Sequence, residues 1–119
     1  YLCDIDVTTE DDSNVLSTTA QLSTGTDDIS TICYDKLKVT GTEVVVTIEG
    51  EDYTFEKSGE ISRNREKRIT VKIPSIQIGT RRLLDVEFAL VDNRDKSTRV
   101  LLNRDIISRF GFVVSPNKD

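Results

Sequence analysis

The residues best suited to do chemistry gather in two stretches, residues 20–28 and 100–105. The first stretch contains the Ser23 hydroxyl and two neighbouring carboxylates, and the second contains Arg104. Carboxylates act as acids, bases or hydrogen-bond acceptors, and a guanidinium pairs with them through a two-pronged contact. A serine hydroxyl becomes a nucleophile only when a base stands beside it. The two stretches are therefore candidates for one site, provided that the fold brings them together.

The chain has no histidine, which excludes several kinds of site. No Ser–His or Cys–His catalytic pair can form within it. Zinc would have to be bound by Cys3, Cys33 and carboxylates, and these two cysteines lack the paired spacing of zinc ligands. We therefore expect no metal and no cofactor. A Ser-x-x-Lys match in residues 115–118 lies in a Pro-containing tail, where we expect no chemistry. We also expect two buried free thiols rather than a disulfide.

The length of 119 residues fits one domain, with an N-terminal strand and polar loop over residues 1–14 and a tail over 115–119. Hydrophobic residues make up 36% of the chain and charged residues 31%, as in an ordinary soluble protein. No apolar run approaches the ~20 residues of a membrane helix. We expect a soluble protein without membrane contact, either cytoplasmic or part of a virion.

Charge is distributed unevenly along the chain. Residues 1–60 carry 14 acidic and 3 basic groups, whereas residues 61–119 carry 7 acidic and 13 basic groups. One interpretation is that the two halves attract each other within one compact domain. The other is that the basic half meets an acidic partner or a nucleic acid. Aromatic residues are not interleaved with the basic ones, so we do not expect nucleic-acid binding.

Alternation of apolar and polar residues with a period of two dominates the sequence and predicts strands. The predicted strands are Val15–Leu22, Glu43–Ile48, 53–55, 68–73, 76–78, 83–91 and Val100–Leu102, with a further short strand over 112–114. Hairpins are predicted at 50–52 and 79–82, where glycines occur. Pro74 is expected to end its strand, and residues 8–14 and 57–67 are expected to be loops.

A helix is predicted only over residues 104–110, because Ile106, Ile107 and Phe110 recur at helical spacing. Gly111 is well placed to end this helix. The pattern as a whole predicts an all-β, mostly antiparallel domain with one short C-terminal helix.

Both candidate stretches resemble segments of the retropepsin-like, retroviral-type aspartic proteases. Residues 20–28 resemble the active-site loop, in which apolar residues precede Asp-Thr-Gly-Ala-Asp-Asp. Residues 101–105 resemble the closing segment, in which an apolar pair precedes Gly-Arg-Asn or Gly-Arg-Asp, a helix and a glycine. Together with residues 65–71 and 87–92, they are closer to the bacterial and phage branch often labelled "ATP-dependent zinc protease". This resemblance implies a closed antiparallel β-barrel or sandwich.

The resemblance also implies a homodimer and a missing catalytic group. In this family two Asp-Thr-Gly loops meet at a twofold axis, and a chain of this length supplies one loop. The chemistry needs two carboxylates that share a proton, so that one acts as an acid and the other as a base. Ser23 stands at the position of the catalytic aspartate and can hold neither role. We expect the chain to lack aspartic-protease activity in this form.

The neighbouring residues match the family pattern. Thr24 corresponds to the residue whose hydroxyl reaches the backbone of the partner loop, and Gly25 suits a tight turn. Asp27 and Asp28 match two acids that receive hydrogen bonds from the main chain of the substrate. Without the match at Arg104, a turn or a helix cap would be the favoured role of these two acids.

Arg104 matches the family arginine that pairs with the first of these acids, so we expect an Arg104–Asp27 ion pair that is partly buried. Arg104 and Asp105 would then support the active loop from the C-terminal helix. Asn103 departs from the family, which has glycine before the arginine. Its side chain would either crowd the loop or adopt the left-handed conformation that asparagine tolerates.

Two segments are candidates for a flap over a substrate groove: the hairpin around Gly50 and the loop around Ser58-Gly59. Three hypotheses for the function remain. The chain is a peptidase disabled at Ser23, a natural pseudoprotease that serves as a structural or protein-binding module, for example in a phage particle, or a β-domain that binds a partner through its basic half. The first two imply a peptide or protein partner.

Overall fold

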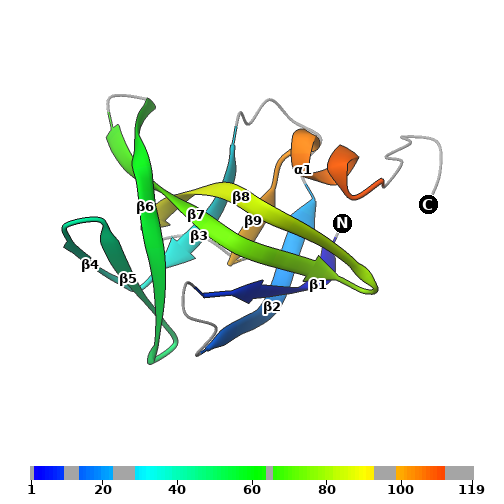
Figure 1. Ribbon diagram of the computed structural model, residues 1–119, viewed down its shortest axis with the longest axis horizontal. Helices are drawn as coiled ribbons and strands as arrows, with labels where there is room; N and C mark the ends of the chain where they lie inside the picture. The colour runs from blue at the N-terminus through cyan, green and yellow to red at the C-terminus, as the bar shows by residue number, and fades with distance from the viewer. Residues whose placement is uncertain (1, 10–13, 23–28, 64–65, 93–98, 112–119) are drawn as a thin grey trace.

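The computed structural model describes residues 2–9, 14–22, 29–63, 66–92 and 99–111. These residues form nine strands and one helix (Figure 1). The elements are β1 (Leu2–Thr8), β2 (Val15–Leu22), β3 (Ser30–Tyr34), β4 (Lys36–Thr40), β5 (Glu43–Ile48), β6 (Glu51–Arg63), β7 (Glu66–Ile78), β8 (Arg81–Asp92), β9 (Val100–Leu102) and α1 (Arg104–Arg109).

Six of the strands close into a barrel in the order β1-β2-β9-β3-β8-β7. The closure is the antiparallel pairing of β1 with β7, where Asp6 faces Gln77 and Val7 faces Ile76. Two pairs in the barrel, β2–β9 and β3–β8, are parallel, and the others are antiparallel. The predicted all-β class, closed barrel and single short helix are confirmed, although the barrel is mixed rather than wholly antiparallel.

The remaining strands, β6, β5 and β4, extend the sheet beyond the barrel from β7. They form the part of the molecule at the left of Figure 1. Strand β7 serves both parts, because residues 66–72 pair with β6 and residues 76–77 pair with β1. The extension is therefore joined to the barrel through one continuous strand.

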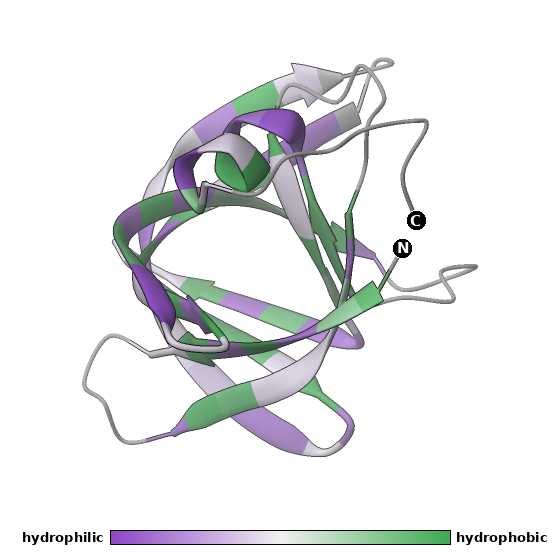
Figure 2. Ribbon diagram, turned by 90° about the vertical axis from the view of Figure 1, so that its right-hand side faces the viewer, coloured by the Kyte–Doolittle hydropathy of each residue, from purple (hydrophilic) through white to green (hydrophobic). Residues whose placement is uncertain are grey.

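Alternation along the strands produces one apolar core. Figure 2 shows the barrel strands as a ring. Every strand but β4 contributes buried apolar side chains to one cluster, and α1 contributes to it as well. In β5, for example, Val44, Val46 and Ile48 are buried, whereas Glu43 is exposed. Burial of apolar surface of this kind is the main favourable contribution to folding.

The prediction of a loop over residues 57–67 is wrong. The described residues of this stretch belong to β6 and β7, which pair as an antiparallel ribbon with a bulge between Lys57 and Gly59. Polar composition resembles that of a loop because this ribbon buries little of its surface: Ser58, Glu60 and Lys67 are exposed. A two-stranded ribbon can be polar on its solvent side and still satisfy its backbone hydrogen bonds.

Pro74 does not end its strand, contrary to the prediction. Strand β7 continues to Ile78, and Pro74 lies where β7 passes from its partner β6 to its partner β1. On the side of β8, the paired positions are Ile73 and Ser75, so no ladder hydrogen bond from residue 74 is needed. Proline is tolerated in a strand at such unpaired positions. The prediction failed because it treated the strand as having the same neighbour throughout.

Three predicted strands and both hairpins agree with the structure, whereas β3 and β4 were not predicted. The strands Val15–Leu22, Glu43–Ile48 and Val100–Leu102 occur as predicted. Both hairpins occur: Glu49 (φ 52°) and Gly50 (φ 83°) form the turn between β5 and β6, and Gly79 (φ 61°) lies in the turn between β7 and β8. Two positive φ values in succession are typical of the tight turns that join antiparallel strands.

Helix α1 also occurs where it was predicted. Asn103 is its N-cap and Phe110 its C-cap, and Gly111 follows with φ 82° and donates its N–H to Ser108 O. The predicted strand over 112–114, the tail over 115–119 and most of the predicted 8–14 loop lie outside the described residues. In the described part of the chain, no helix has the length and apolar character to span a membrane.

Candidate functional site

The segment expected to carry the site, with Ser23, Thr24, Gly25, Asp27 and Asp28, lies outside the described residues, but both of its flanks are described. On one side, β2 ends at Leu22, which pairs with Leu102 of the parallel strand β9. On the other side, Ser30 begins β3 and hydrogen-bonds to Asn103. Both flanks therefore meet residues 102–103, directly before Arg104.

The parallel pairing of β2 with β9 explains this arrangement. Parallel strands end at the same edge of a sheet, so the chain leaves Leu22 and Leu102 side by side. Strand β3 runs antiparallel to β9, so it begins at that same edge. Leu22 and Ser30, which flank residues 23–28 at a distance, therefore both lie beside the residues that directly precede α1.

Ser30 and Asn103 form a buried, reciprocal pair of hydrogen bonds. The Ser30 hydroxyl donates to Asn103 Oδ1 at 3.1 Å and accepts from the Asn103 backbone N–H at 2.9 Å. Asn103 Oδ1 also accepts from the backbone N–H of Ile106 at 3.0 Å, which caps α1. Asn103 was identified from the sequence as a candidate, but Ser30 was not. An Asn three residues before Ile106 was the available cap signal, whereas nothing local marked Ser30.

Asn103 has extended backbone angles, φ −82° and ψ 172°. The predicted left-handed alternative is therefore wrong, because capping the helix requires a non-helical, extended residue. The described neighbours accommodate the side chain, which is buried and hydrogen-bonded.

Arg104 and Asp105 are the first two residues of α1, and both are exposed. A carboxylate in the first turn interacts favourably with the N-terminal end of the helix, so Asp105 is placed to stabilise α1. The expected partner of Arg104, Asp27, is outside the described residues, and the Arg104–Asp27 ion pair stays a prediction.

One of the two flap candidates, the turn at Gly50, is held by polar contacts. Asp35 accepts a hydrogen bond from the backbone N–H of Glu49 at 2.8 Å. Arg99 binds Asp35 at 3.2 Å and lies 3.8 Å from the Glu49 carboxylate. This turn also lies at the opposite end of Figure 1 from α1. It is therefore fixed to the body of the protein and distant from the flanks of the Ser23 segment.

The other flap candidate, Ser58-Gly59, lies at the bulge in the β6–β7 ribbon. The Ser58 hydroxyl is 2.7 Å from a carboxylate oxygen of Glu87 and 2.8 Å from Thr70 Oγ1. Because a carboxylate only accepts, Ser58 donates to Glu87 and Thr70 donates to Ser58. The bulge thereby connects the ribbon to β8 of the barrel.

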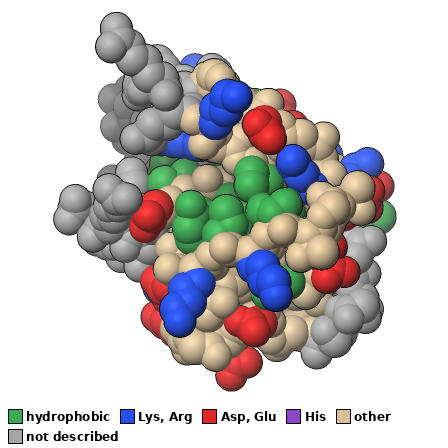
Figure 3. All heavy atoms as spheres, turned by 90° about the vertical axis from the view of Figure 1, so that its left-hand side faces the viewer, with side chains coloured by type: hydrophobic (Ala, Val, Ile, Leu, Met, Phe, Trp, Pro, Cys, Tyr) green, Lys and Arg blue, Asp and Glu red, His purple; other side chains and the backbone are tan. Residues whose placement is uncertain are grey.

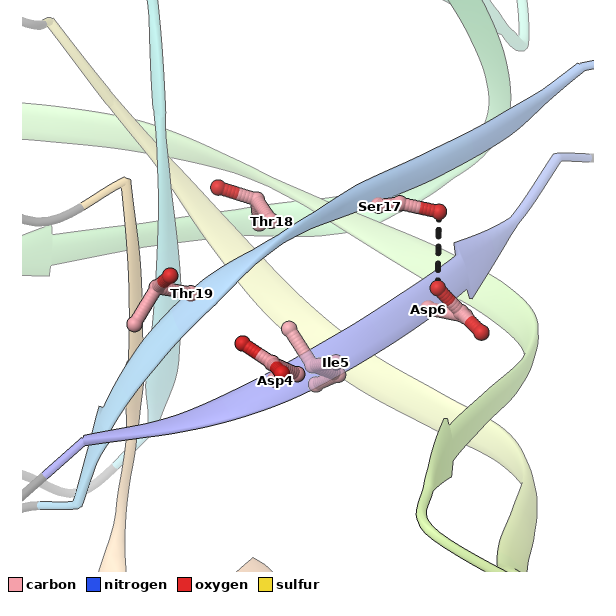
Figure 4. Close-up of a pocket in the computed structure, with 6 residues that line it drawn as sticks. All are labelled: Asp4, Ile5, Asp6, Ser17, Thr18 and Thr19. Carbon is pink, nitrogen blue, oxygen red and sulfur yellow. Dashed lines mark hydrogen bonds between the residues drawn. The ribbon is translucent and has the colours of Figure 1, made fainter.

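A shallow pocket on β1 and β2 was not predicted from the sequence (Figure 4). Asp4 and Asp6 line it from β1, and Ser17, Thr18 and Thr19 line it from β2. The Ser17 hydroxyl donates to Asp6 at 2.7 Å. Alternation places Asp4 and Asp6 on the same face of the β1–β2 pair as their partners Thr19 and Ser17. In the described part of the chain, no group of His, Cys, Asp or Glu is arranged to hold a metal ion.

Figure 3 shows a group of hydrophobic side chains at the surface, bordered by both basic and acidic side chains. The two signs of charge are interspersed on this face rather than separated. The uneven charge of the sequence therefore does not produce a single-signed surface here, and the face lacks the basic patch that nucleic-acid binding requires.

Neither Cys3 nor Cys33 forms a disulfide, as predicted, but only Cys33 is fully buried. They lie on β1 and β3, which are separated in the barrel by β2 and β9. Burial raises the pKa of the Cys3 thiol, and the negative charge of Asp4 raises it further. Burial also raises the pKa of Tyr53, with smaller contributions from Glu51 and Glu49. Both groups are therefore protonated at neutral pH, and Cys3 is a poor nucleophile there.

Comparison with known proteins yields a structural match only. No family model matches the sequence, and no curated protein does. Among solved structures, the chain is similar to the crystal structure of Lpg0085 from Legionella pneumophila subsp. pneumophila str. Philadelphia 1, a protein with unknown function (DUF785). The two share 21% sequence identity with a TM-score of 0.73, over 99% of this chain and 92% of that chain. At this level of identity the likeness concerns the fold.

Proposed function

We propose that the chain is a retropepsin-like aspartic peptidase domain that is inactive in this form because Ser23 replaces the catalytic aspartate. The observation that carries the proposal is the position of the two flanks of residues 23–28. Leu22 pairs with Leu102 and Ser30 bonds to Asn103, so the two stretches that resemble the family active site adjoin in space. They are about 80 residues apart in the sequence, and such proximity is not expected of two unrelated matches.

In this proposal the site is completed by a second copy of the chain. Two Ser23 segments meet at a twofold axis, with Thr24 contacting the backbone of the partner segment and Gly25 giving room to the bound peptide. Asp27 and Asp28 accept hydrogen bonds from the main chain of the peptide, and Arg104 pairs with Asp27. No group at position 23 can take a proton from water, so peptide would be bound without being cleaved.

The β6–β7 ribbon is the better flap in this proposal. The alternative, the turn at Gly50, is held to Asp35 and Arg99 and lies at the far end of the molecule from α1. The ribbon carries the Lys57–Gly59 bulge, and bulges commonly occur beside binding sites, where they redirect a strand.

The test is to restore the carboxylate with Ser23→Asp and to measure cleavage of a peptide library between pH 3 and 7. We expect the variant to cleave peptides and to be inhibited by a statine-type peptide, whereas the unchanged chain and Ser23→Ala are inactive. The rate should be highest where the paired carboxylates share one proton, and it should fall at neutral pH. A folded, dimeric S23D protein that cleaves no peptide in the library would contradict the proposal.

A second candidate, a natural pseudoprotease used as a structural or protein-binding module, is favoured by Asn103. The family has glycine at this position, and here the asparagine side chain is buried and hydrogen-bonds to Ser30 and to the backbone of Ile106. If only the catalytic aspartate had been lost, we would expect glycine at position 103. In this chain the asparagine side chain occupies that position and packs there. If S23D is active only when Asn103→Gly is added, the chain has diverged beyond the single substitution.

A further inference from the structure

Strand β4 is the last strand of the sheet extension, and among the described strands it pairs only with β5. It lies at the left-hand end of the molecule in Figure 1. A two-residue turn joins Thr40 to Glu43, the first pair of the β4–β5 hairpin. In such a hairpin the first pair and every second pair after it are hydrogen-bonded, so Leu37 and Val39 direct their backbone N–H and C=O groups away from β5. A strand with free groups along one side can pair there with a further strand.

The two faces of β4 differ in character. Alternation places Lys36, Lys38 and Thr40 on one face and Leu37 and Val39 on the other. The apolar face continues the core, because the β5 partners of Leu37 and Val39 are fully buried valines. Leu37 packs against the core cluster, whereas Val39 is 41% exposed. The row of apolar side chains therefore reaches the free edge and is only partly covered there.

The two lysines of β4 are exceptional in this half of the chain. Residues 1–60 carry 14 acidic groups and three basic ones, which are Lys36, Lys38 and Lys57. Lys57 forms an ion pair with Glu60 at 3.3 Å. Lys36 and Lys38 are exposed, and within the described part of the chain neither has an ion pair or a side-chain hydrogen bond. Two of the three cations in an acidic half thus line a free strand edge.

Distance decides which charges a further strand would meet. It would lie about 4.8 Å from β4, with its side chains about 5 Å from the lysines directly opposite. The acidic residues on the same face lie on the inner strands β5 and β6; they are Glu43, Asp52 and Glu56. Even β5 is about 10 Å from the added strand, roughly one Debye length at physiological ionic strength. The lysines therefore dominate, and the edge favours acidic side chains.

The same lysines disfavour a second copy of the chain at this edge. Antiparallel pairing of β4 with its own copy about Lys38 would set Lys38 against Lys38. Pairing about Leu37 would set Lys36 against Lys38. Like charges directly opposite each other destabilise a strand pair. Lysines on an edge strand protect it against self-association in this way.

We propose that the free edge of β4 binds an extended segment of another protein, which adds to the sheet as a further strand. The segment carries acidic side chains at alternate positions opposite Lys36 and Lys38, and apolar side chains between them beside Leu37 and Val39. Main-chain hydrogen bonds give the affinity, and the alternating side chains give the selectivity. The inference is independent of the proposed peptidase ancestry, because it uses neither residues 23–28 nor Arg104.

The experiment follows the backbone amides of Leu37 and Val39 by NMR in the full chain while a synthetic peptide is added. The probe has about eight residues, the length of an ordinary strand, with glutamate alternating with valine and both ends blocked. We expect it to slow hydrogen exchange at these two amides, whereas a peptide with lysine in place of glutamate does not. Unchanged exchange at up to about 1 mM of the glutamate peptide, or equal protection by the lysine peptide, would overturn the inference.

Two variants test the edge itself. Lys36→Glu combined with Lys38→Glu should weaken binding of the glutamate peptide about tenfold or more, since two attractive pairs become repulsive. Val39→Pro removes an N–H from the free side of β4 and should abolish binding, and proline is tolerated on edge strands. If V39P does not fold, K36E/K38E carries the test. Unweakened binding by folded K36E/K38E would overturn the inference.

The matched control is Lys67→Glu combined with Arg82→Glu, which changes the net charge by the same amount at exposed positions of β7 and β8. It should leave binding unchanged. An equal loss in this control would show that the peptide responds to the overall charge of the protein, which would overturn the inference.

Other occupants of the edge give different results. Concentration-dependent protection of Leu37 and Val39 without peptide would indicate a second copy of the chain. Tighter binding at β4 of a single-stranded oligonucleotide than of the glutamate peptide would indicate a phosphate ligand. Either result would overturn the proposal of an acidic protein segment.

Discussion

Polar side-chain contacts of different kinds hold the two ends of the β3–β9 pair. These strands run antiparallel, so the residues that flank β9 meet those at the two ends of β3. At one end, Ser30 and Asn103 form a neutral, buried pair. At the other, Asp35 and Arg99 form a charged pair near solvent, with Glu49 alongside. The polar contacts at the two ends of this strand pair therefore differ mainly in charge and burial.

The difference shows where a polar contact determines structure. A buried neutral hydrogen bond contributes little more than the water contacts it replaces, but breaking it leaves an unpaired group. An ion pair that reaches the surface is weakened by water and salt, and here the Asp35 side chain is more exposed than that of Arg99. We therefore expect the Ser30–Asn103 end to be more sensitive to substitution than the Asp35–Arg99 end.

The largest effect is expected for Asn103→Ala. This change leaves the Ser30 hydroxyl without its acceptor and removes the N-cap of α1. It should lower the free energy of unfolding by about 2–4 kcal/mol, from an unpaired buried group plus a lost cap. Urea unfolding followed by circular dichroism measures it. A loss below about 1 kcal/mol would mean that the Ser30–Asn103 end is no more sensitive to substitution than the Asp35–Arg99 end.

Ser30→Ala should have the next largest effect, about 1–2 kcal/mol, because the cap survives and only the contacts of the hydroxyl are lost. The two residues share a contact, so the loss in the double variant S30A/N103A should be smaller than the sum of the single losses. Urea unfolding of all four proteins gives this coupling. Strict additivity would show that the two residues act independently.

The smallest effect is expected for Asp35→Asn at the charged end. Its side-chain oxygen can still accept from Glu49 N–H, whereas the charge beside Arg99 and the hydrogen bond that Arg99 donates to the other carboxylate oxygen are lost. We expect a loss of less than about 1 kcal/mol at low salt, which disappears in 0.5–1 M NaCl as screening increases. Unfolding curves at both salt concentrations measure it. A loss as large as that of N103A would remove the contrast between the two ends.

Much of the fold could be predicted from the sequence, because alternation is strong where one strand face is buried. Val15–Leu22, Glu43–Ile48 and Val100–Leu102 are such strands, and Gly111 marked the end of the helix. Prediction failed where the partner of a strand determines its structure. The polar β6–β7 ribbon looked like a loop, and Pro74 is tolerated only because β7 changes partners there.

The candidate site could be predicted in part. The resemblance marked Asn103 and Arg104 at the start of α1, and the structure places both flanks of the Ser23 segment beside them. Ser30 was missed, since a serine between Ile29 and Thr31 gives no local signal. Its role arises from a contact with a residue 73 positions away, which only the pairing of β3 with β9 creates.

In the proposed dimer, two copies of residue 23 face each other at a twofold axis, so a cysteine at this position can form a disulfide with its own copy. We would introduce Ser23→Cys into a chain whose own cysteines are replaced by Cys3→Ser and Cys33→Ala, and measure disulfide-linked dimer on a non-reducing gel after mild oxidation. We expect rapid and nearly complete cross-linking, far above that of Ser17→Cys at an exposed control position. Cross-linking of S23C no faster than that of the control would contradict it.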